Sequence, residues 1–301
     1  MPILISGSMA FDNILAFNGR FADHILPQQV EKLSVSFLTP HMRSDYGGCA
    51  GNIAYAVKQL GGDPLLLATV GKDGGHYLER LREMEIDTGH VVMREDCYTA
   101  QCTIVTDEHQ NQITAFHPGA MGLAHEHEVP ADASIALAIV SPNSKEAMQS
   151  HAKQLHAAGI PFVFDPGQAM PQFSADELQQ LIEQASWLAL NDYEAFLLSE
   201  RMGCDRAALS VQVRGMVVTL GEKGCEIWQE GDCQSIDPIT PAEVVDPTGC
   251  GDAWRGALLH GLQQGWDLLR CARLGNYMGA VKVAHRGPQN YRINADEVQT
   301  F

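Results

Sequence analysis

The sequence predicts an α/β fold with a mostly parallel sheet that is covered by helices on both faces. Three observations support this prediction. From residue 135 onward, short apolar segments alternate with amphipathic helical ones. Several of the apolar segments end in polar residues or glycine, as parallel strands do where a ligand binds at their carboxyl ends. Two glycine-rich turns, at 47–52 and 246–252, open directly into helices.

The first part of the chain mixes elements of the main sheet with extended segments that lack helical periodicity. Strand Ile3–Ser6 ends at Gly7, and a glycine-opened helix presents an apolar face from Ala50 to Leu60. The extended segments form two groups, and we expect these groups to build a small separate β-layer. The expected elements are strands at 3–6 and 65–70, a helix at 76–84, and extended segments at 17–21, 33–38, 99–105 and 112–116.

The second part of the chain alternates regularly and should supply most of the parallel sheet. A hairpin turning at Gly231 and Asp232 follows the last parallel strand. We expect residues 1–301 to form one domain around one principal core. The expected strands are 135–140, 161–164, 187–190, 216–220, 226–229 and 233–236, and the expected helices are 145–157, 176–183, 193–201, 253–264, 268–284 and a short one after Asn294.

The composition points to a protein that acts on small molecules. The chain has 37 acidic and 20 basic residues, and its net charge of −17 argues against nucleic acid or an anionic membrane as a partner. An acidic protein that handles phosphates needs local donors and a divalent metal, for which Mg²⁺ is the natural candidate. The eight cysteines lack metal-ligand spacing, and no apolar run is long enough to span a membrane. We therefore expect a cytoplasmic protein with reduced thiols.

The turn Asp246-Pro247-Thr248-Gly249-Cys250-Gly251-Asp252 is the main candidate for chemistry. A helix N-terminus exposes unpaired N–H groups, and flanking glycines let a phosphate approach that backbone closely. A carboxylate beside a phosphate needs a task of its own, such as taking the proton of an attacking hydroxyl, so Asp252 is a candidate general base. The structural alternative is that Asp252 stabilises the helix dipole and Asp246 ends a turn.

Polar residues at other strand ends should lie at the same edge of the sheet. Each of them has an alternative role as a turn or helix cap, but their convergence favours a ligand site. We expect the cluster His125-Glu126-His127-Glu128 to be a solvated loop rather than a metal site. The usual P-loop and dinucleotide-binding glycine motifs are absent, which disfavours a dehydrogenase. The strand-end residues are Gly7, Ser8 and Asp12, then Asp165 to Gln168, Asn191 to Glu194, and Thr219 to Glu222.

Residues 47–62 and 246–252 resemble the two signatures of the ribokinase, or phosphofructokinase-B, family. The resemblance runs in order from Gly7 to about Gln289. It implies a ribokinase-like, doubly wound α/β domain with a small β-sheet lid from about 13–45 and 95–118, a lid through which two copies would pair. It also implies transfer of the γ-phosphate of ATP to a primary hydroxyl. The segments 7–13, 19–21, 35–37, 116–121 and 191–194 are most similar to bacterial adenosine kinases, which implies adenosine as the acceptor.

The same resemblance implies roles for individual residues. Asp252 is the general base, and the backbone N–H groups around Gly249, Cys250 and Gly251 form the anion hole. Glu194 orders Mg²⁺ and its water molecules. The residues implied to hold the ribose of the acceptor are Asp12, Gly48 and Asn52, those around its base are Ser8, Ser36, Phe116 and Gln168, and those that contact ATP are Asn191, Thr219, Gly221 and Asn276.

The chain departs from the family pattern at two places. Cys250 replaces the usual alanine and brings an oxidisable thiol into the anion hole. Gly287-Pro288-Gln289 differs from the pattern near the family's monovalent-cation site, which puts activation by K⁺ in question. The alternatives to an adenosine kinase are a ribose or fructose kinase, a nucleoside kinase of broad specificity, and a nucleoside-binding protein without catalysis. Asp252 and Glu194 disfavour the last alternative.

Overall fold

The computed structural model describes residues 1–25, 34–109, 111–131, 134–299 and 301. Its strands form a nine-stranded sheet, here called the large sheet, and a four-stranded small sheet. Neighbours from β5 through to β11 pair in parallel, whereas β12 and β13 add an antiparallel hairpin at the edge. The spatial order is β13 (Asp232–Ile236), β12 (Cys225–Gln229), β11 (Gly215–Thr219), β10 (Trp187–Asn191), β9 (Phe162–Phe164), β8 (Leu137–Val140), β1 (Ile3–Ser6), β4 (Pro64–Gly71) and β5 (Val91–Arg94).

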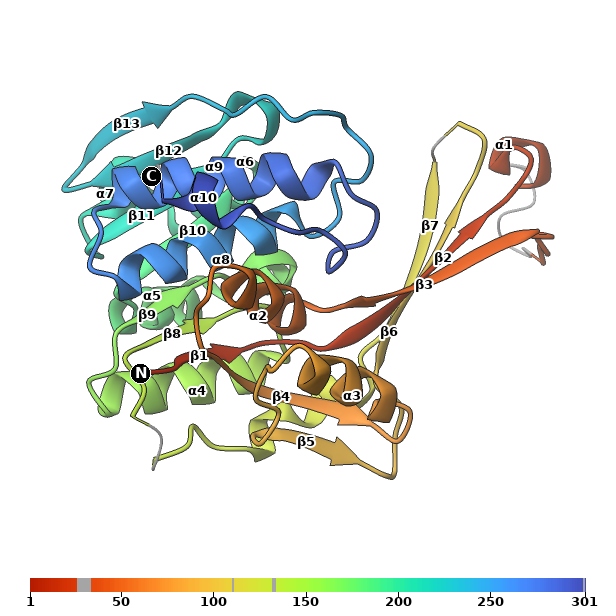
Figure 1. Ribbon diagram of the computed structural model, residues 1–301, viewed down its shortest axis with the longest axis horizontal. Helices are drawn as coiled ribbons and strands as arrows, with labels where there is room; N and C mark the ends of the chain where they lie inside the picture. Colours follow the sequence, from red (N-terminus) through yellow and green to blue (C-terminus); the bar gives the residue numbers. More distant parts are fainter. Residues whose placement is uncertain (26–33, 110, 132–133, 300) are drawn as a thin grey trace.

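Helices cover both faces of the large sheet (Figure 1), which confirms the predicted fold class. One face carries α2 (Cys49–Gln59), α3 (Gly75–Glu83), α8 (Cys250–Gln263) and α9 (Leu268–Val283). The other carries α4 (Lys145–Ala157), α5 (Ala175–Gln184), α6 (Asp192–Met202) and α7 (Arg206–Ser210). Short 3₁₀ segments lie at Gly119–Glu126, Gly167–Gln172 and Gly221–Lys223, and α10 (Ala295–Val298) lies near the end of the chain.

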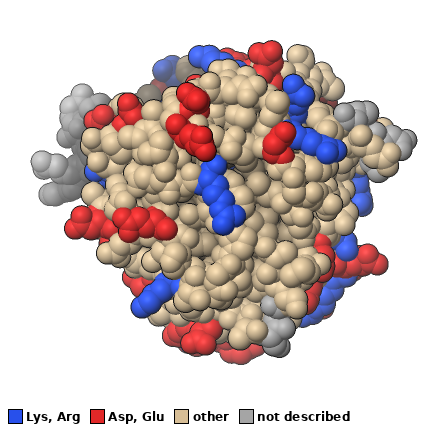
Figure 2. Space-filling model, turned by 90° about the vertical axis from the view of Figure 1, so that its left-hand side faces the viewer, with Lys and Arg blue, Asp and Glu red and all other residues tan. Residues whose placement is uncertain are grey.

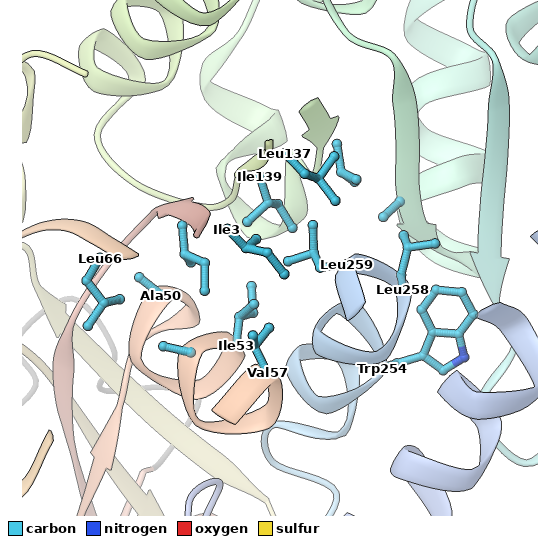
Figure 3. Close-up of a cluster of buried hydrophobic side chains, with 14 of the residues drawn as sticks. Ile3, Ala50, Ile53, Val57, Leu66, Leu137, Ile139, Trp254, Leu258 and Leu259 are labelled. Atoms are coloured by element: carbon cyan, nitrogen blue, oxygen red, sulfur yellow. The ribbon is translucent and has the colours of Figure 1, made fainter. Parts of the chain in front are cut away.

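Successive side chains of each strand point into two different apolar cores. Ile3 and Ile5 contribute to the core under α2 and α8, whereas Leu4 contributes to the core under α4 to α7. Figure 3 shows the first core, where Ile53 of α2 and Leu259 of α8 lie close to Ile3. Because both faces are buried, the strand sequences read as continuous apolar runs. This packing fixes α2 and α8 side by side, so their N-termini reach the same edge of the sheet.

The small sheet projects from the body of the large sheet (Figure 1). Its strands β6 and β7 form the hairpin expected from the sequence. Strands β2 and β3 pair antiparallel, with Asp12 opposite Asp45. The spatial order is β3 (His41–Gly47), β2 (Ala10–Ala16), β6 (Ala100–Thr106) and β7 (Gln112–His117).

The extended segments expected at 17–21 and 33–38 are not strands in the described part of the chain; residue 33 lies outside it. The strands lie at β2 and β3 instead, and Phe21 begins the short helix α1 (Phe21–His24). The rings of Phe17, Phe21 and Phe37 pack together with centroids 4.9 to 5.9 Å apart. These aromatic residues therefore form a local cluster rather than one face of a strand. Two short elements, β5 and α7, were not anticipated.

On the face shown in Figure 2, basic side chains are scattered among acidic ones and do not gather into one patch. Among the described helices, none is both long enough and apolar enough to cross a membrane.

Candidate active site

A cleft of about 1290 Å³ lies between the carboxyl ends of the large-sheet strands and the small sheet. The ends of β1, β9, β10 and β11 open into it, as expected for a parallel sheet. The polar strand ends predicted from the sequence therefore converge on one site. The lining includes Ser8, Asp165, Gln168, Asn191, Glu194, Thr219 and Gly221 from these ends, Asp12 of β2 and Phe116 of β7 from the small sheet, Gly48 and Asn52 from the start of α2, residues 249–252 from the start of α8, and Asn276 from α9.

Asp252 lies in the first turn of α8 and reaches the cleft. Gly249 is the N-cap of this helix. Its φ of 79° is left-handed, and a Cβ at this position would lie 2.5 Å from Pro288. Burial raises the pKa of Asp252 to about 7, although a hydrogen bond from Asn52 and the charge of Arg255 favour the ionised form. A carboxylate with this pKa can accept a proton near neutral pH.

The turn before α8 offers backbone donors to an anion, but not all three of those predicted. The N–H of Cys250 donates to the carbonyl of Pro247 at 3.1 Å and is therefore already paired. The N–H groups of Gly249 and Gly251 have no hydrogen-bond partner among the described residues. The thiol of Cys250 lies 4.0 Å from the carbonyl of Asp246, and burial raises its pKa to about 11. This thiol is therefore protonated and only weakly nucleophilic.

Asp246 holds the turn in place through its carboxylate. It accepts hydrogen bonds from the N–H groups of Thr248 and Gly287, both at 3.0 Å, and from Arg43 at 2.8 Å. Burial alone would raise the pKa of Asp246, but these donors hold it well below its usual range. The ammonium of Lys282 donates to the backbone carbonyls of Asp246 and His285 at 2.7 and 3.1 Å.

The start of α2 supplies the opposite wall. Gly48 has a φ of 85°, and a Cβ there would lie 2.5 Å from the carbonyl of Ser8, so only glycine fits. The hydroxyl of Ser8 accepts the N–H of Cys49 at 3.2 Å. Asn52 donates to Oδ2 of Asp252 at 2.8 Å. Asn52 lines the cleft, as its predicted role at the ribose requires, and its amide nitrogen is hydrogen-bonded to the candidate base.

Asp12 points into the cleft from β2, next to Asp45 on β3. Burial and the neighbouring charge of Asp45 raise the pKa of Asp12 to about 6, against the opposing charge of Arg43. Phe116 is 53% exposed, so its ring is available to a ligand. Gln168 lies 4.0 Å from the thiol of Cys49. The structure does not bring Ser36 to this site: it is exposed, in a segment without regular structure, and outside the cleft lining.

Asn191 and Glu194 form a reciprocal cap at the start of α6. The side chain of Asn191 accepts the N–H of Glu194, and the carboxylate of Glu194 accepts the N–H of Asn191. Arg255 lies one turn after Asp252 and pairs with Asp165 at 2.9 Å and with Glu194 at 3.7 Å. This buried arginine therefore joins α8 to the ends of β9 and β10.

The carboxylates present fit a metal that is held mainly by phosphates. Among the described residues, no group of three or more histidines, cysteines or carboxylates could hold a metal ion, and this includes residues 125–128. Mg²⁺ usually keeps several water molecules and binds one or two carboxylates together with the substrate phosphates. Glu194 at the cleft is compatible with that kind of contact.

Thr219 and Gly221, the residues predicted to contact ATP, line the cleft together with the loop at 238–244. Asn276 also lies here, but its amide accepts from Trp254 at 3.1 Å and donates to the carbonyl of Asp237 at 2.9 Å. Both polar atoms of the Asn276 side chain are therefore paired within the protein, and its contact with ATP stays a prediction.

Three charged residues of the site were not found from the sequence: Arg43, Arg255 and Lys282. The position of Arg255 three residues after Asp252, on the same helix face, was a usable signal. Arg43 and Lys282 gave no such signal, because their contacts depend on how the small sheet and α9 pack.

Comparisons with known proteins agree with this fold. The sequence model of the pfkB family carbohydrate kinases matches residues 19–294. A nucleoside kinase from Methanocaldococcus jannaschii is 30% identical over 268 residues, which cover 88% of each chain. The structure of a Burkholderia thailandensis nucleoside kinase in complex with inosine is 43% identical, with a TM-score of 0.90 over 99% of this chain and 96% of that one. An adenosine kinase from Sinorhizobium meliloti shares the fold at 22% identity, with a TM-score of 0.80 over 99% of this chain and 98% of that one.

Proposed function

Because the chain belongs to the pfkB family of carbohydrate kinases, we propose that it is a nucleoside kinase that transfers the γ-phosphate of ATP to the 5′-hydroxyl of a purine nucleoside. The observation that carries this proposal is the placement of Asp252. Its carboxylate has a pKa near 7 and lies at a helix N-terminus that opens into the cleft. This position suits a base that must work beside a phosphate.

The reaction needs one proton acceptor and a set of anion donors. Asp252 takes the proton of the 5′-hydroxyl as the oxygen attacks the γ-phosphorus. The bond between this phosphorus and the β–γ bridging oxygen breaks, and ADP leaves. The N–H groups of Gly249 and Gly251 lie at the start of α8, where the helix dipole also favours negative charge on the transferring group.

Mg²⁺ supplies charge neutralisation on the triphosphate when it is bound. Glu194 would hold its water molecules, since it lines the cleft at the start of α6. Thr219 and Gly221 line the part of the cleft proposed for ATP.

A nucleoside fits the acceptor half of the cleft better than a free sugar. Asp12 provides a carboxylate for a vicinal diol, and Phe116 and Met121 provide apolar surface beside it for a base. The Burkholderia thailandensis nucleoside kinase has structures with inosine and with ADP-inosine. We therefore propose adenosine and inosine as the first acceptors to test, with a sugar kinase as the alternative.

An assay of ADP release over adenosine, inosine, guanosine, cytidine, ribose and fructose, with and without Mg²⁺, tests this function. We expect a purine nucleoside to give the highest kcat/KM, and activity to require Mg²⁺. Asp252→Asn should lower kcat by about 10²- to 10⁴-fold, because the amide keeps the shape but cannot take the proton. Asp267→Asn, at the N-cap of α9 and outside the cleft lining, is the matched control and should retain parental activity. Faster turnover of ribose or fructose than of any nucleoside would contradict the proposal.

A further inference from the structure

Gln289 lies behind Asp252 in a row of buried hydrogen bonds. Its side-chain amino group donates to Oδ1 of Asn52 at 3.0 Å and to the hydroxyl of Tyr77 at 2.6 Å. Asn52 in turn donates to Oδ2 of Asp252 at 2.8 Å. We propose that Gln289 is a positioning residue, which fixes the amide of Asn52 so that its nitrogen rather than its oxygen faces Asp252.

The two ends of the row determine the direction of every hydrogen bond in it. The carbonyl of Gly47 can only accept, so the hydroxyl of Tyr77 donates to it at 2.8 Å. Burial raises the pKa of Tyr77 and keeps this hydroxyl protonated. The oxygen of Tyr77 therefore accepts from Gln289, whose second amino hydrogen goes to Asn52. The nitrogen of Asn52 is then the end of the amide that faces Asp252.

An apolar side chain would fill the place of Gln289 at a lower cost in free energy. Gln289 is 2% exposed, and its Oε1 has no hydrogen-bond partner in the described part of the chain. A buried oxygen without a partner destabilises the fold. The guanidinium of Arg80 donates to the backbone carbonyl of Gln289 at 2.9 Å, which fixes the backbone of this residue. The hydrogen bond to Tyr77 fixes the amide of Gln289, and the hydrogen bond to Asn52 then fixes the orientation of Asn52.

Other groups also act on Asp252, but Gln289 differs from them. Arg255 favours the ionised carboxylate, whereas Asp165 and Asp12 oppose it. Gln289 carries no charge and contacts Asn52, so its effect on Asp252 passes through that amide. The titratable groups that interact with Asp252 are Arg255 and Cys250 of α8, Asp165 after β9, Asp12 of β2, Cys49 of α2, Tyr77 of α3, and Tyr291.

The inference rests on the proposed role of Asp252 as the base, and a titration that needs no catalysis separates the two. Asp252 is titrated by ¹³C NMR of the full chain labelled at aspartate carboxyl carbons, with its signal identified by its loss in Asp252→Asn. Gln289→Met keeps a similar volume without donors, and we expect it to raise the midpoint of Asp252 by about one pH unit, because the donor from Asn52 is no longer held in place. The acid limb of the plot of kcat against pH should shift to higher pH by the same amount. The KM values should stay within about threefold of those of the parent.

A double-mutant cycle and a second variant make the test decisive. Asn52→Ala should shift the midpoint at least as far, and adding Gln289→Met to it should give no further shift. Gln289→Glu turns an acceptor toward Asn52 and should shift the midpoint in the same direction. An unchanged midpoint in both Gln289 variants, or an equal shift with and without Asn52, would overturn the inference. A shifted midpoint that kcat does not follow supports the positioning role and removes Asp252 as the base.

Discussion

The guanidinium of Arg43 lies 2.8 Å from the carboxylate of Asp246, so an ion pair joins the small sheet to the turn that opens α8. Arg43 also lies 3.2 Å from Asp45 on its own strand. Asp246 fixes the turn through the N–H groups of Thr248 and Gly287. The position of the small sheet is therefore coupled to the backbone that precedes Asp252.

Replacing Arg43 by methionine tests this coupling. The side chain of Arg43 is 36% exposed, so its ion pair is partly screened by solvent. We expect Arg43→Met to lower kcat/KM for the nucleoside by about two- to fivefold, which corresponds to at most about 1 kcal/mol. The difference from the parent should shrink as salt is raised.

Arg94→Met is the matched control for this variant. Arg94, the last residue of β5, pairs with Asp96 and Glu126, and all three lie outside the cleft lining. Equal effects of the two substitutions on kcat/KM would argue that Arg43 has no special link to the site.

The stability of the protein should depend on pH through Asp252. Its pKa is about 7 in the folded chain, against 3.8 normally, so the folded state binds more protons than the unfolded state between these values. The associated stability is present below about pH 4 and is lost as the pH rises through 7. Asp252→Asn cannot ionise, and we expect its Tm to exceed that of the parent by about 2–5 °C at pH 8.

This comparison is made without ligands, by thermal unfolding at pH 5 and pH 8. The excess in Tm should be small at pH 5 and larger at pH 8. An excess that is the same at both values would show that the amide stabilises the fold for a reason other than charge. An excess in Tm that grows from pH 5 to pH 8 would show that the ionised carboxylate of Asp252 lowers the stability of the fold.

Much of the fold was predictable because its signals are local. The alternation of apolar strands and helices gave the large sheet, and the boundaries of α4 at Lys145–Ala157 agree with the prediction. The prediction of extended segments around Phe17 and Phe37 was wrong, because aromatic residues that cluster in a loop give the same composition as a strand. Pattern alone does not distinguish the two.

The candidate site was predictable where a residue follows a strand or opens a helix. Asp12, Asp252 and Glu194 were found in this way, and all three line the cleft. The partner of Asn52 was not predictable, since α2 and α8 are about 200 residues apart in the chain. Its contact with Asp252 depends on how these helices pack.

Lys282 provides a reason to expect that K⁺ does not activate the enzyme. This fully buried ammonium donates to the carbonyls of Asp246 and His285, close to the residues where the family resemblance implies a monovalent cation. The protein therefore carries its own cation at this turn. We expect kcat in KCl, NaCl and N-methylglucamine chloride at equal ionic strength to agree within about twofold, a difference of less than 0.5 kcal/mol in barrier.

Lys282→Met extends the test. It leaves the two carbonyls without this donor, so we expect lower thermal stability and a lower kcat. A parental enzyme that is tenfold faster in KCl than in NaCl would show that the ammonium does not replace a bound ion.

The last prediction concerns Asp12 and the ribose of the acceptor. An ionised carboxylate can accept hydrogen bonds from both hydroxyls of a vicinal diol, and each is worth about 1.5–3 kcal/mol. We expect kcat/KM for 2′-deoxyadenosine to be about 10- to 100-fold below that for adenosine. Because the pKa of Asp12 is about 6, the carboxylate is charged above this pH and neutral below it. The ratio of kcat/KM for adenosine to that for 2′-deoxyadenosine should therefore decrease as the pH falls from 8 to 5.

Two variants separate the diol from the base in this recognition. Asp12→Ala should remove most of the difference between the two nucleosides, because neither then has the carboxylate as a partner. Phe116→Ala should weaken the binding of both nucleosides by similar factors, since its ring would stack on the base at about 1 kcal/mol. Binding is measured by calorimetry and turnover by ADP release. Parental kcat/KM on adenosine in Asp12→Ala would show that Asp12 does not bind the ribose.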